Sequence, residues 1–442
     1  MSDVLTQNKL LISKLDFLSI SAALCIATIP WSLKLNTLVI IGFGSSLLLY
    51  IIFKKGKIRV EPKRFLLGSV VFSVALIWLL STTDQESGLK FLERSLSALI
   101  FPFLFSLIYN RFQLNIRLIL RLFMISCLLR YFVFLYEIID FELVFIFDYW
   151  KEVLIQFNQL FKVHGLHPSY FSMFLGFCSL ICYDTIFRTK SNLKKSFWII
   201  ALLVFFVINL SLAAKMPIVA TIISLVLVTL ISTLRKSSKT QKTIVASLLV
   251  TGVLILGLFL YKVPNPISQD IINYYQLLNG EKAEDIYDYN QYGINSSLTT
   301  WEKTNRVHIW KSGIEVVQDN FFLGVGTGDI KQELNNKFSL NKQDYLATKD
   351  TNTHNQILDY LIKYGIVGFL LIVCAFTAYF NAAWKNHNQL FLMFLVLSCL
   401  CMLTENILNR QYGIVFFFYV NSLFFFYRPT IEKKKLDVRK SA

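Results

Sequence analysis

Twelve apolar runs divide this chain, and each has a length suited to a helical crossing of a membrane. A helix needs about 20 mostly apolar residues to cross the hydrocarbon layer. The 442 residues are 55% hydrophobic and include 40 Phe, which is too apolar for a soluble domain of this size. The sequence therefore predicts an all-α polytopic membrane protein with about 12 transmembrane helices. The runs lie at 15–33, 35–53, 65–81, 95–109, 118–137, 168–186, 196–211, 216–234, 243–261, 356–380, 388–404 and 412–427.

Basic residues are distributed unevenly between the two sides of this layout, although the net charge is +16 overall. If the N-terminus is cytoplasmic, the connections placed inside hold most of the short-loop Lys and Arg, as at 54–64, 235–242 and 428–440. Lys and Arg concentrate in cytoplasmic loops, so both termini are predicted to be cytoplasmic. The charge is then explained by topology and by anionic inner-leaflet lipid, and it gives no support to a nucleic-acid partner.

One long polar stretch, residues 262–355, lies between the ninth and tenth runs and is predicted to be extracytoplasmic. Within it, 296–320 has helical spacing and 329–338 is a possible short helix. The expected apolar stripe of the longer helix consists of Val307, Trp310, Ile314 and Val317. The segment 140–161 is apolar on one face only, which favours an interfacial helix. We expect three regions: an N-terminal bundle (1–194), a region with the outer loop (195–380), and C-terminal helices with a basic tail (381–442).

His354 and Arg306 are the two candidate catalytic residues of the outer loop. His354 lies at the predicted mouth of the tenth span, where an imidazole can accept a proton from a sugar hydroxyl; capping the helix is the alternative. Arg306 carries a fixed charge that suits bidentate phosphate binding. An ordinary ion pair with Glu302, one helical turn away, is the alternative for this arginine.

Three further cations lie at predicted outer ends of spans: Lys215 in the hairpin SLAAKMP, Arg94, and Arg410 in ENILNRQYG. Together with Arg306 they could clamp a lipid diphosphate and stabilise its charge as it leaves. Snorkelling to outer-leaflet phosphate is the alternative reading. Arg130, inside the fifth span, is expected to face protein or a cavity, as is the Asp359/Lys363 pair in the tenth.

Metal and nucleotide sites receive little support from the sequence. His164 and His167 are separated by a turn, and no third ligand is apparent, so a polar wall of a substrate cavity or helix capping fits them better. The seven cysteines all lie in apolar runs and cannot cross-link the outer loop. GVGTGD lacks the strand–helix context and the Gly-Lys-Ser/Thr ending of nucleotide sites. It reads as a sharp turn, or less readily as an anion-binding nest. No metal and no cofactor are expected.

Several short motifs follow one another in an order that resembles a known family. They are Ser211 and Lys215 in the hairpin, Arg-x-x-x-Trp at 306–310, Gly-x-Gly-x-Gly at 324–328, and His-Asn at 354–355 followed by Leu358, Gly365 and Gly368. The chain resembles the O-antigen ligase / O-antigen polymerase superfamily of bacterial integral-membrane glycosyltransferases over about 195–375. HPSY near 167 and ENILNRQYG near the C-terminus fit the wider family.

The resemblance implies a GT-C-like, metal-independent, inverting enzyme at the periplasmic face of the inner membrane. It would move a glycan from a polyprenyl (undecaprenyl) diphosphate carrier to a hydroxyl acceptor such as lipid A-core. By motif, His354 would be the base, Arg306 would bind the diphosphate, and Lys215 stands where the family often has arginine. A repeat-unit polymerase adding to a growing glycan, or a protein glycosylation enzyme, has the same motifs. A lipid-linked sugar transporter is the alternative from another class, although transporters place polar groups near mid-membrane.

Overall fold

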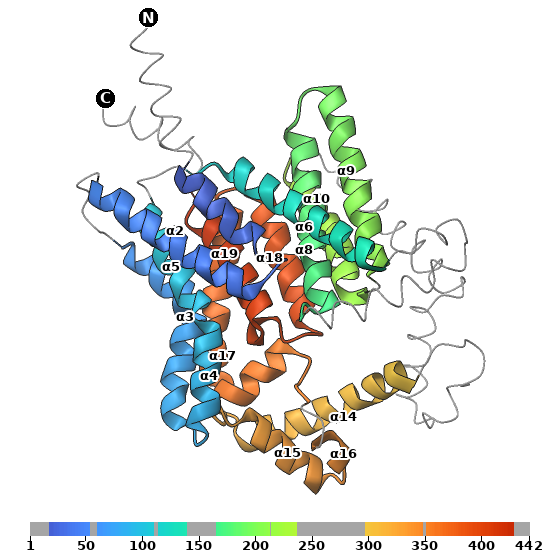
Figure 1. The fold of residues 1–442 in the computed structure, drawn as a ribbon. Helices are drawn as coiled ribbons and strands as arrows, with labels where there is room; N and C mark the ends of the chain where they lie inside the picture. Colours follow the sequence, from blue (N-terminus) through green and yellow to red (C-terminus); the bar gives the residue numbers. More distant parts are fainter. Residues whose placement is uncertain are drawn as a thin grey trace, which may run out of the picture.

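The computed structural model describes residues 17–53, 60–109, 114–138, 165–212, 214–236, 297–347 and 351–427 (Figure 1). These residues form helices and no strand, which confirms the all-α prediction for the described part of the chain. The predicted interfacial helix at 140–161, the ninth run at 243–261 and His164 lie outside the described residues. The helices longer than four residues are a first helix Phe17–Ala27, α2 (Leu33–Phe53), α3 (Pro62–Trp78), α4 (Gln85–Ser95), α5 (Ser97–Ile108), α6 (Ile116–Ile138), α8 (Pro168–Arg188), α9 (Asn192–Ser211), α10 (Lys215–Lys236), α14 (Ser297–Asp319), α15 (Ile330–Leu340), α17 (Gln356–Lys385), α18 (Gln389–Met402) and α19 (Gln411–Phe425).

Every predicted apolar run that falls in the described residues is helical, but not every helix is long enough to span a membrane by itself. Among the residues that the structure describes, seven helical segments are long and apolar enough to cross a membrane. Four more are apolar but shorter: Phe17–Ala27, Lys215–Ile231, α18 and α19. The predicted count of 12 spans is therefore not confirmed. The fourth span also begins earlier than predicted, because the polar helix α4 continues into α5 and the two form one segment, Gln85–Ile108.

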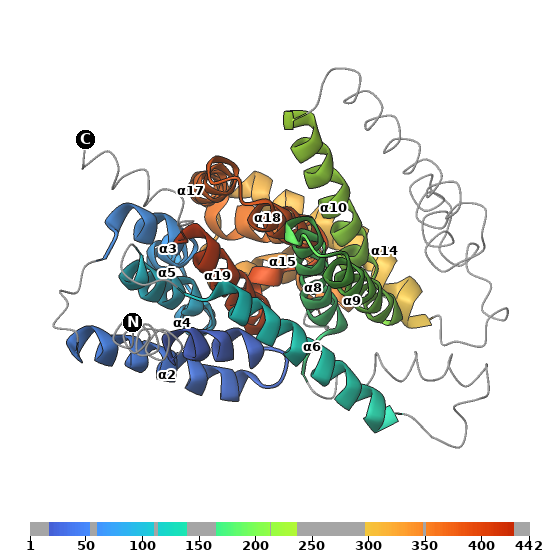
Figure 2. The same ribbon diagram turned by 90° about the horizontal axis from the view of Figure 1, so that it is seen from above.

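The core of the bundle is built around α19, which packs against α5, α17 and α18 (Figure 2). This helix is apolar on all sides and nearly all of its side chains are buried, as expected of a central helix. Phe416 makes ring contacts with aromatic residues of α6, α8 and α18, at centroid distances of 4.5 to 5.8 Å. Offset and edge-to-face aromatic pairs stabilise such packing, so this Phe-rich segment fixes the positions of its neighbours.

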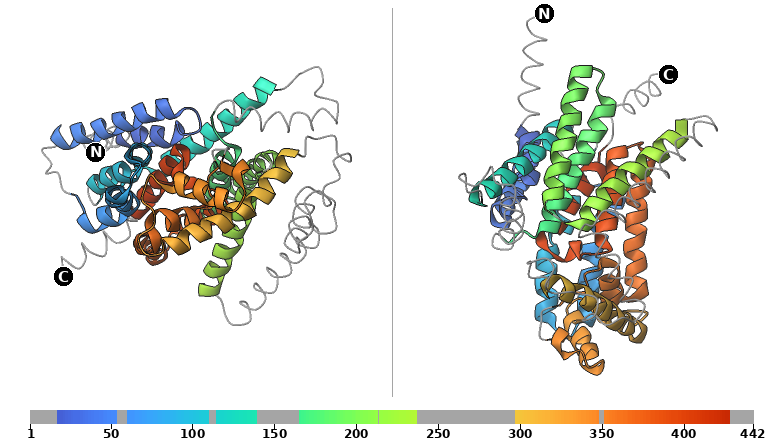
Figure 3. Two further views of the ribbon diagram at one scale, coloured as in Figure 1. Left: turned by 90° about the horizontal axis from the view of Figure 1, so that it is seen from below. Right: turned by 90° about the vertical axis from the view of Figure 1, so that its right-hand side faces the viewer.

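Helices α14 and α15, with the short helix α16 (Asp344–Ala347), cover one end of the bundle. This end lies opposite the α8–α9 connection at 189–191 (Figures 1 and 3). The predicted helices at 296–320 and 329–338 are thus present as α14 and α15. A small apolar cluster joins them to the first turns of α17: Ile309, Val316, Leu334, Phe338, Leu346, Leu358 and Ile362.

The buried face of α14 agrees with the predicted stripe only in part, because Trp310 and Val317 pack against this cluster but Ile314 does not. Ile314 is 52% exposed, whereas Ile309 and Val316 are buried. The reason is Gly313, at which an added Cβ would lie 2.9 Å from Leu358. Because α17 approaches α14 closely at this glycine, the face of α14 that carries residues 309, 313 and 316 points towards α17. Ile314 then points away from α17. The side chain of Val307 lies outside the described set.

Helix α17 is interrupted at Gly365, which has φ 57° and ψ −168°. The segment after α14 pairs with the break. Val325 and Gly326 donate backbone hydrogen bonds to the carbonyls of Ile362 and Lys363, and Ile366 donates to Phe321. Backbone groups freed by a broken helix must find other partners inside a membrane protein. The GVGTGD segment supplies them, and it ties the outer layer to the bundle.

Candidate functional site

His354 lies in the short segment that leads into α17. Its backbone is left-handed, with φ 45°, a conformation that costs a non-glycine residue energy and is concentrated at functional sites. Its N–H donates to Asn352 Oδ1 at 3.0 Å. The next residue, Asn355, is the N-cap of α17, and its Oδ1 accepts from the N–H groups of Ile357 and Leu358. The capping function therefore belongs to Asn355, and the His354 side chain is left for another role.

Arg306 and Trp310 are one turn apart on α14, and the tryptophan docks the helix onto the His354 segment. Trp310 Nε1 donates to the carbonyl oxygen of Thr353 at 2.8 Å. Residues four apart lie on the same helix face, so this bond directs Arg306 towards the same place. The Arg-x-x-x-Trp spacing thus has a physical reason: one residue anchors the helix and the other reaches the site.

Glu405, in the connection after α18, meets both candidate catalytic residues. Its Oε1 lies 3.5 Å from Arg306 Nη2, and its Oε2 lies 3.5 Å from His354 Nδ1. All three side chains are partly exposed, at 33% for Arg306, 32% for His354 and 20% for Glu405. Both contacts are longer than a normal hydrogen bond, as is common in catalytic groups before substrate binds. The structure therefore brings His354 and Arg306 together through a carboxylate.

The charges around Glu405 keep its carboxyl group ionised. Burial acts to raise the pKa of Glu405, but the hydrogen-bonding and charge interactions with His354, and the charges of Arg306 and His167, outweigh it. The pKa of this carboxyl therefore lies below its ordinary value of 4.5. A carboxylate that stays charged can orient the imidazole and hold the guanidinium in the absence of a ligand.

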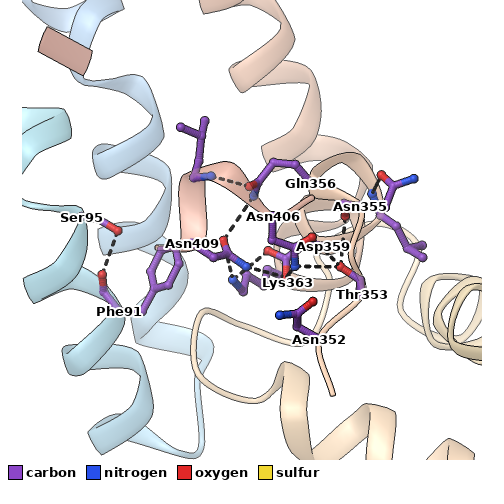
Figure 4. A network of polar contacts seen from close by, with 12 residues as sticks. Phe91, Ser95, Asn352, Thr353, Asn355, Gln356, Asp359, Lys363, Asn406 and Asn409 are labelled. Atoms are coloured by element: carbon purple, nitrogen blue, oxygen red, sulfur yellow. Dashed lines mark hydrogen bonds and ion pairs between the residues drawn. The ribbon is translucent and has the colours of Figure 1, made fainter. Parts of the chain in front are cut away.

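A buried polar network fixes the segments that carry His354 and Glu405 (Figure 4). Asn406 Nδ2 donates to Thr353 Oγ1 at 2.9 Å and to Asp359 Oδ1 at 3.1 Å. Thr353 precedes His354 and Asn406 follows Glu405, so this bond sets the distance between the imidazole and the carboxylate. The predicted Asp359/Lys363 pair is present, with 2.8 Å between the charged atoms and both side chains buried. Asn409 bonds to both members of the pair.

The structure places the other predicted site residues on α4 and at the starts of α8, α10 and α19. His167 is the N-cap of α8, as its capping alternative predicted, and its charge also acts on Glu405. Arg410 is the exposed N-cap residue of α19, and Tyr170 lies within electrostatic range of both Arg410 and Glu405. Arg94 is exposed on α4, where its Nε donates to the Lys90 carbonyl. Lys215 is exposed at the first position of α10.

Sequence reasoning missed Glu405, although the motif ENILNRQYG was noted for its arginine. The available signal was an acidic residue directly after an apolar run, at a predicted outer end. The alternative partner predicted for Arg306 was Glu302, and the side chain of Glu302 lies outside the described residues. Arg130 is buried as expected of a residue facing protein, with its guanidinium 4.0 Å from the Phe134 ring centre.

The glycine segment does not form an anion-binding nest. Its backbone N–H groups donate to other groups of the protein, as those of Gly324, Val325, Gly326 and Gly328 do. The carboxylate of Asp329 accepts from the N–H groups of Thr83 and Asp84. The turn reading is therefore the right one. Within the described ranges, no cluster of three or more His, Cys, Asp or Glu side chains is arranged to hold a metal ion.

The fold and the site define a multi-pass helical membrane protein with a His–Glu–Arg cluster at one end of its bundle. A protein-family model described as O-antigen ligase matches residues 199–373. The match covers less than half of the chain but contains every motif from Ser211 to Gly368, and it confirms the resemblance predicted for 195–375. Residues 199–373 are thus similar to membrane glycosyltransferases of the O-antigen ligase/polymerase type, and together with the apolar helices this similarity indicates a multi-pass bacterial inner-membrane protein. A search of curated proteins found no match.

Proposed function

We propose that this protein is a glycosyltransferase of the O-antigen ligase type. It transfers a glycan from a polyprenyl diphosphate carrier to a hydroxyl of an acceptor such as lipid A-core. The observation that carries the proposal is the contact of one carboxylate, that of Glu405, with both His354 and Arg306 at 3.5 Å. The histidine and the arginine lie inside the region matched by the family model, and the glutamate lies beyond its end. A base and a fixed cation held side by side suit a reaction that removes a proton while a diphosphate leaves.

The His354–Glu405 contact defines which nitrogen acts as the base. A carboxylate only accepts hydrogen bonds, so Nδ1 carries the proton when the pair closes. Nε2 then keeps its lone pair and faces the acceptor hydroxyl. The proton moves from that hydroxyl to Nε2, the oxygen attacks the anomeric carbon, and the bond to the diphosphate breaks with inversion. Glu405 stabilises the imidazolium that forms.

Arg306 binds the diphosphate in this mechanism. In the free protein a single guanidinium nitrogen faces Glu405 at 3.5 Å, so the other donors of the planar group can engage phosphate oxygens. Three further cations attract the negatively charged diphosphate of the carrier: Arg410, Arg94 and Lys215. His167 adds a polar group at the start of α8, where its charge acts on Glu405.

Two features of the fold support a periplasmic site. The site lies at the α14–α16 end of the bundle, whereas Arg188, Lys190 and Lys194 lie around the α8–α9 connection at the opposite end (Figure 1). Basic residues mark the cytoplasmic side. Glycans on polyprenyl carriers would therefore meet the His–Glu–Arg cluster from the periplasmic leaflet.

Replacement of the proposed base tests the mechanism directly. His354→Ala is expected to reduce transfer from a polyprenyl diphosphate-linked glycan to lipid A-core on the order of 10²- to 10⁴-fold. The readout is glycolipid formation by purified protein in liposomes, with folding checked by circular dichroism. His308→Gln is the matched control, because His308 lies on α14 and bonds to Gln343 rather than to the cluster. Unchanged transfer by His354→Ala would remove the base assignment.

A chelator provides a second test. Because the proposed mechanism uses only side chains, transfer is expected to continue at an unchanged rate in excess EDTA. A loss of activity that added Mg²⁺ or Mn²⁺ restores would contradict it.

The acceptor is tested by a surface glycolipid profile of the host with and without the gene. Lipid A-core lacking glycan in the deletion strain supports the ligase. Core bearing a single repeat unit would instead assign the repeat-unit polymerase. Bare core with the carrier-linked glycan accumulating on the cytoplasmic side would instead favour a transporter, and an unchanged profile would point to another glycan or to a protein acceptor.

A further inference from the structure

A cavity opens at the end of the bundle opposite the His–Glu–Arg cluster, close to the α8–α9 connection. Its volume is ≈ 460 Å³, and it lies between the start of α6, the end of α8, the start of α9 and the turn before α18. Arg117 and Arg121 line it from α6, and Lys194 lines it from α9. It is therefore a basic pocket at the end of the bundle away from the proposed reaction.

Most of the positive charge in this pocket is not neutralised within the described part of the chain. Arg188 pairs with Asp184, the acidic residue of the lining, with 2.7 Å between Nε and Oδ2. Among the described residues, no carboxylate lies within 4.0 Å of the cationic groups of Arg117, Arg121 or Lys194. Three cations around one cavity repel one another unless an anion occupies it.

An apolar groove of ≈ 820 Å³ continues from the same residues along the bundle surface. Arg121, Lys194 and Trp198 line both the pocket and the groove. Beyond them the groove is lined by apolar side chains of α6 and α9. Its rim includes Leu193 at 83% exposure and Phe197 at 62%. Helices α6 and α9 each pack against α8, and the groove occupies the space between them.

We propose that the pocket and groove together bind an anionic phospholipid of the leaflet on this face. The phosphate enters the basic pocket and contacts Arg117, Arg121 and Lys194. One acyl chain lies in the groove, and the Trp198 ring sits at the boundary between the two, as interfacial tryptophans do. A basic pocket between transmembrane helices is suited to anionic headgroups. A soluble phosphate compound would use the pocket and leave the apolar groove empty, so the continuity of the two cavities favours a lipid.

Binding is tested with purified full-length protein by native mass spectrometry, with phosphatidylglycerol and phosphatidylcholine of equal chain length as probes. The wild type is expected to retain phosphatidylglycerol in preference. Each charge removed in R117Q, R121Q and K194Q should weaken retention about fivefold, and all three together on the order of a hundredfold. Lys63→Gln is the matched control. Lys63 is exposed near the same end of the bundle, beside Arg64, whose guanidinium contacts the Phe425 carbonyl at the end of α19.

A second variant tests the groove without changing the charge. Ala201 lines the groove from α9, and Ala201→Trp should fill part of it. This variant is expected to lose long-chain phosphatidylglycerol while keeping a short-chain analogue with the same headgroup. If the triple variant does not fold, Ala201→Trp alone decides whether lipid occupies the groove.

Any one of four outcomes would overturn the proposal. The first three are equal retention of phosphatidylglycerol by the wild type and the triple variant, equal retention of the two phospholipids, and displacement of phosphatidylglycerol by a stoichiometric polyprenyl phosphate. The third would assign the cavity to the carrier. A groove already occupied by another segment of this chain would leave Ala201→Trp without effect on lipid, which also contradicts it.

Discussion

Glu405 is the residue on which the chemistry of the proposed site depends most. Its two oxygens face a base and a cation, so removing its charge should affect orientation more than binding. Glu405→Gln is expected to lower kcat on the order of 10²-fold and to change the KM for the carrier-linked donor much less. Glu405→Asp should restore part of the loss, and Glu93→Gln on α4 serves as an exposed control. Equal effects on kcat and KM, with no rescue by aspartate, would indicate a purely structural role.

The depressed pKa of Glu405 also predicts how stability depends on pH. The unfolded carboxyl titrates near 4.5 and the folded one below that value. The stabilisation is therefore fully present above about pH 4.5 and is lost as the pH falls through the folded pKa. The difference in Tm between the wild type and Glu405→Gln should shrink as the pH falls below about 4.5. Thermal unfolding in detergent across this range measures it, and a difference that grew on acidification would contradict the assignment.

At the residue scale, short motifs predicted the candidates and the structure supplied their partner. His354 and Arg306 were identifiable because an imidazole can accept a proton and a guanidinium can bind phosphate at a membrane surface. Glu405 was not, because it lies after a different span and its contact is created only when α18 and α14 come to the same end. A contact of this kind depends on tertiary packing, which one sequence does not reveal.

At the element scale, the break in α17 predicts that no side chain fits at Gly365. Gly365 has a positive φ, and an added Cβ would lie 2.4 Å from the Phe322 backbone. Gly365→Ala should therefore displace the 321–326 segment and destabilise the protein by about 1–3 kcal/mol or more. Gly42→Ala in α2 is the control, because no atom lies within 4 Å of its added Cβ. That change should be neutral or slightly stabilising. Thermal unfolding of the two variants compares them, and equal Tm values would show that the break is not tightly packed.

Helix boundaries followed from hydropathy, but the break and the buried face of α14 did not. Residues 356–380 are mostly apolar, with Asp359 and Lys363 as the charged exceptions, so the sequence predicts one continuous span, and it does not distinguish Gly365 from an ordinary glycine in a helix. Its conformation is set by the glycine segment that pairs with it from 40 residues earlier. Gly313 acts similarly on α14, where a close approach to Leu358 rather than periodicity decides which face is buried.

At the scale of the whole molecule, the helical architecture was predictable because a membrane leaves few alternatives for an apolar chain. The number of crossings was not, because hydropathy locates apolar runs without telling how far each helix extends across the layer. Helices α18 and α19 have only 14 and 15 residues, yet they lie in the centre of the bundle. Protein rather than lipid surrounds them, so their length need not match the hydrocarbon thickness.

The orientation of the molecule is the last prediction, and it connects the site to its substrate. Ser191 lies in the α8–α9 connection, and Leu340 ends α15 with 74% of its surface exposed. In spheroplasts, a membrane-impermeant maleimide should label Leu340→Cys, and it should label Ser191→Cys only after the membrane is permeabilised. The wild-type chain, whose native cysteines all lie in apolar runs, gives the background. The opposite pattern would place the His–Glu–Arg cluster in the cytoplasm. A glycan already moved across the membrane could not then reach Arg306, and the ligase mechanism would fail whatever the side-chain geometry.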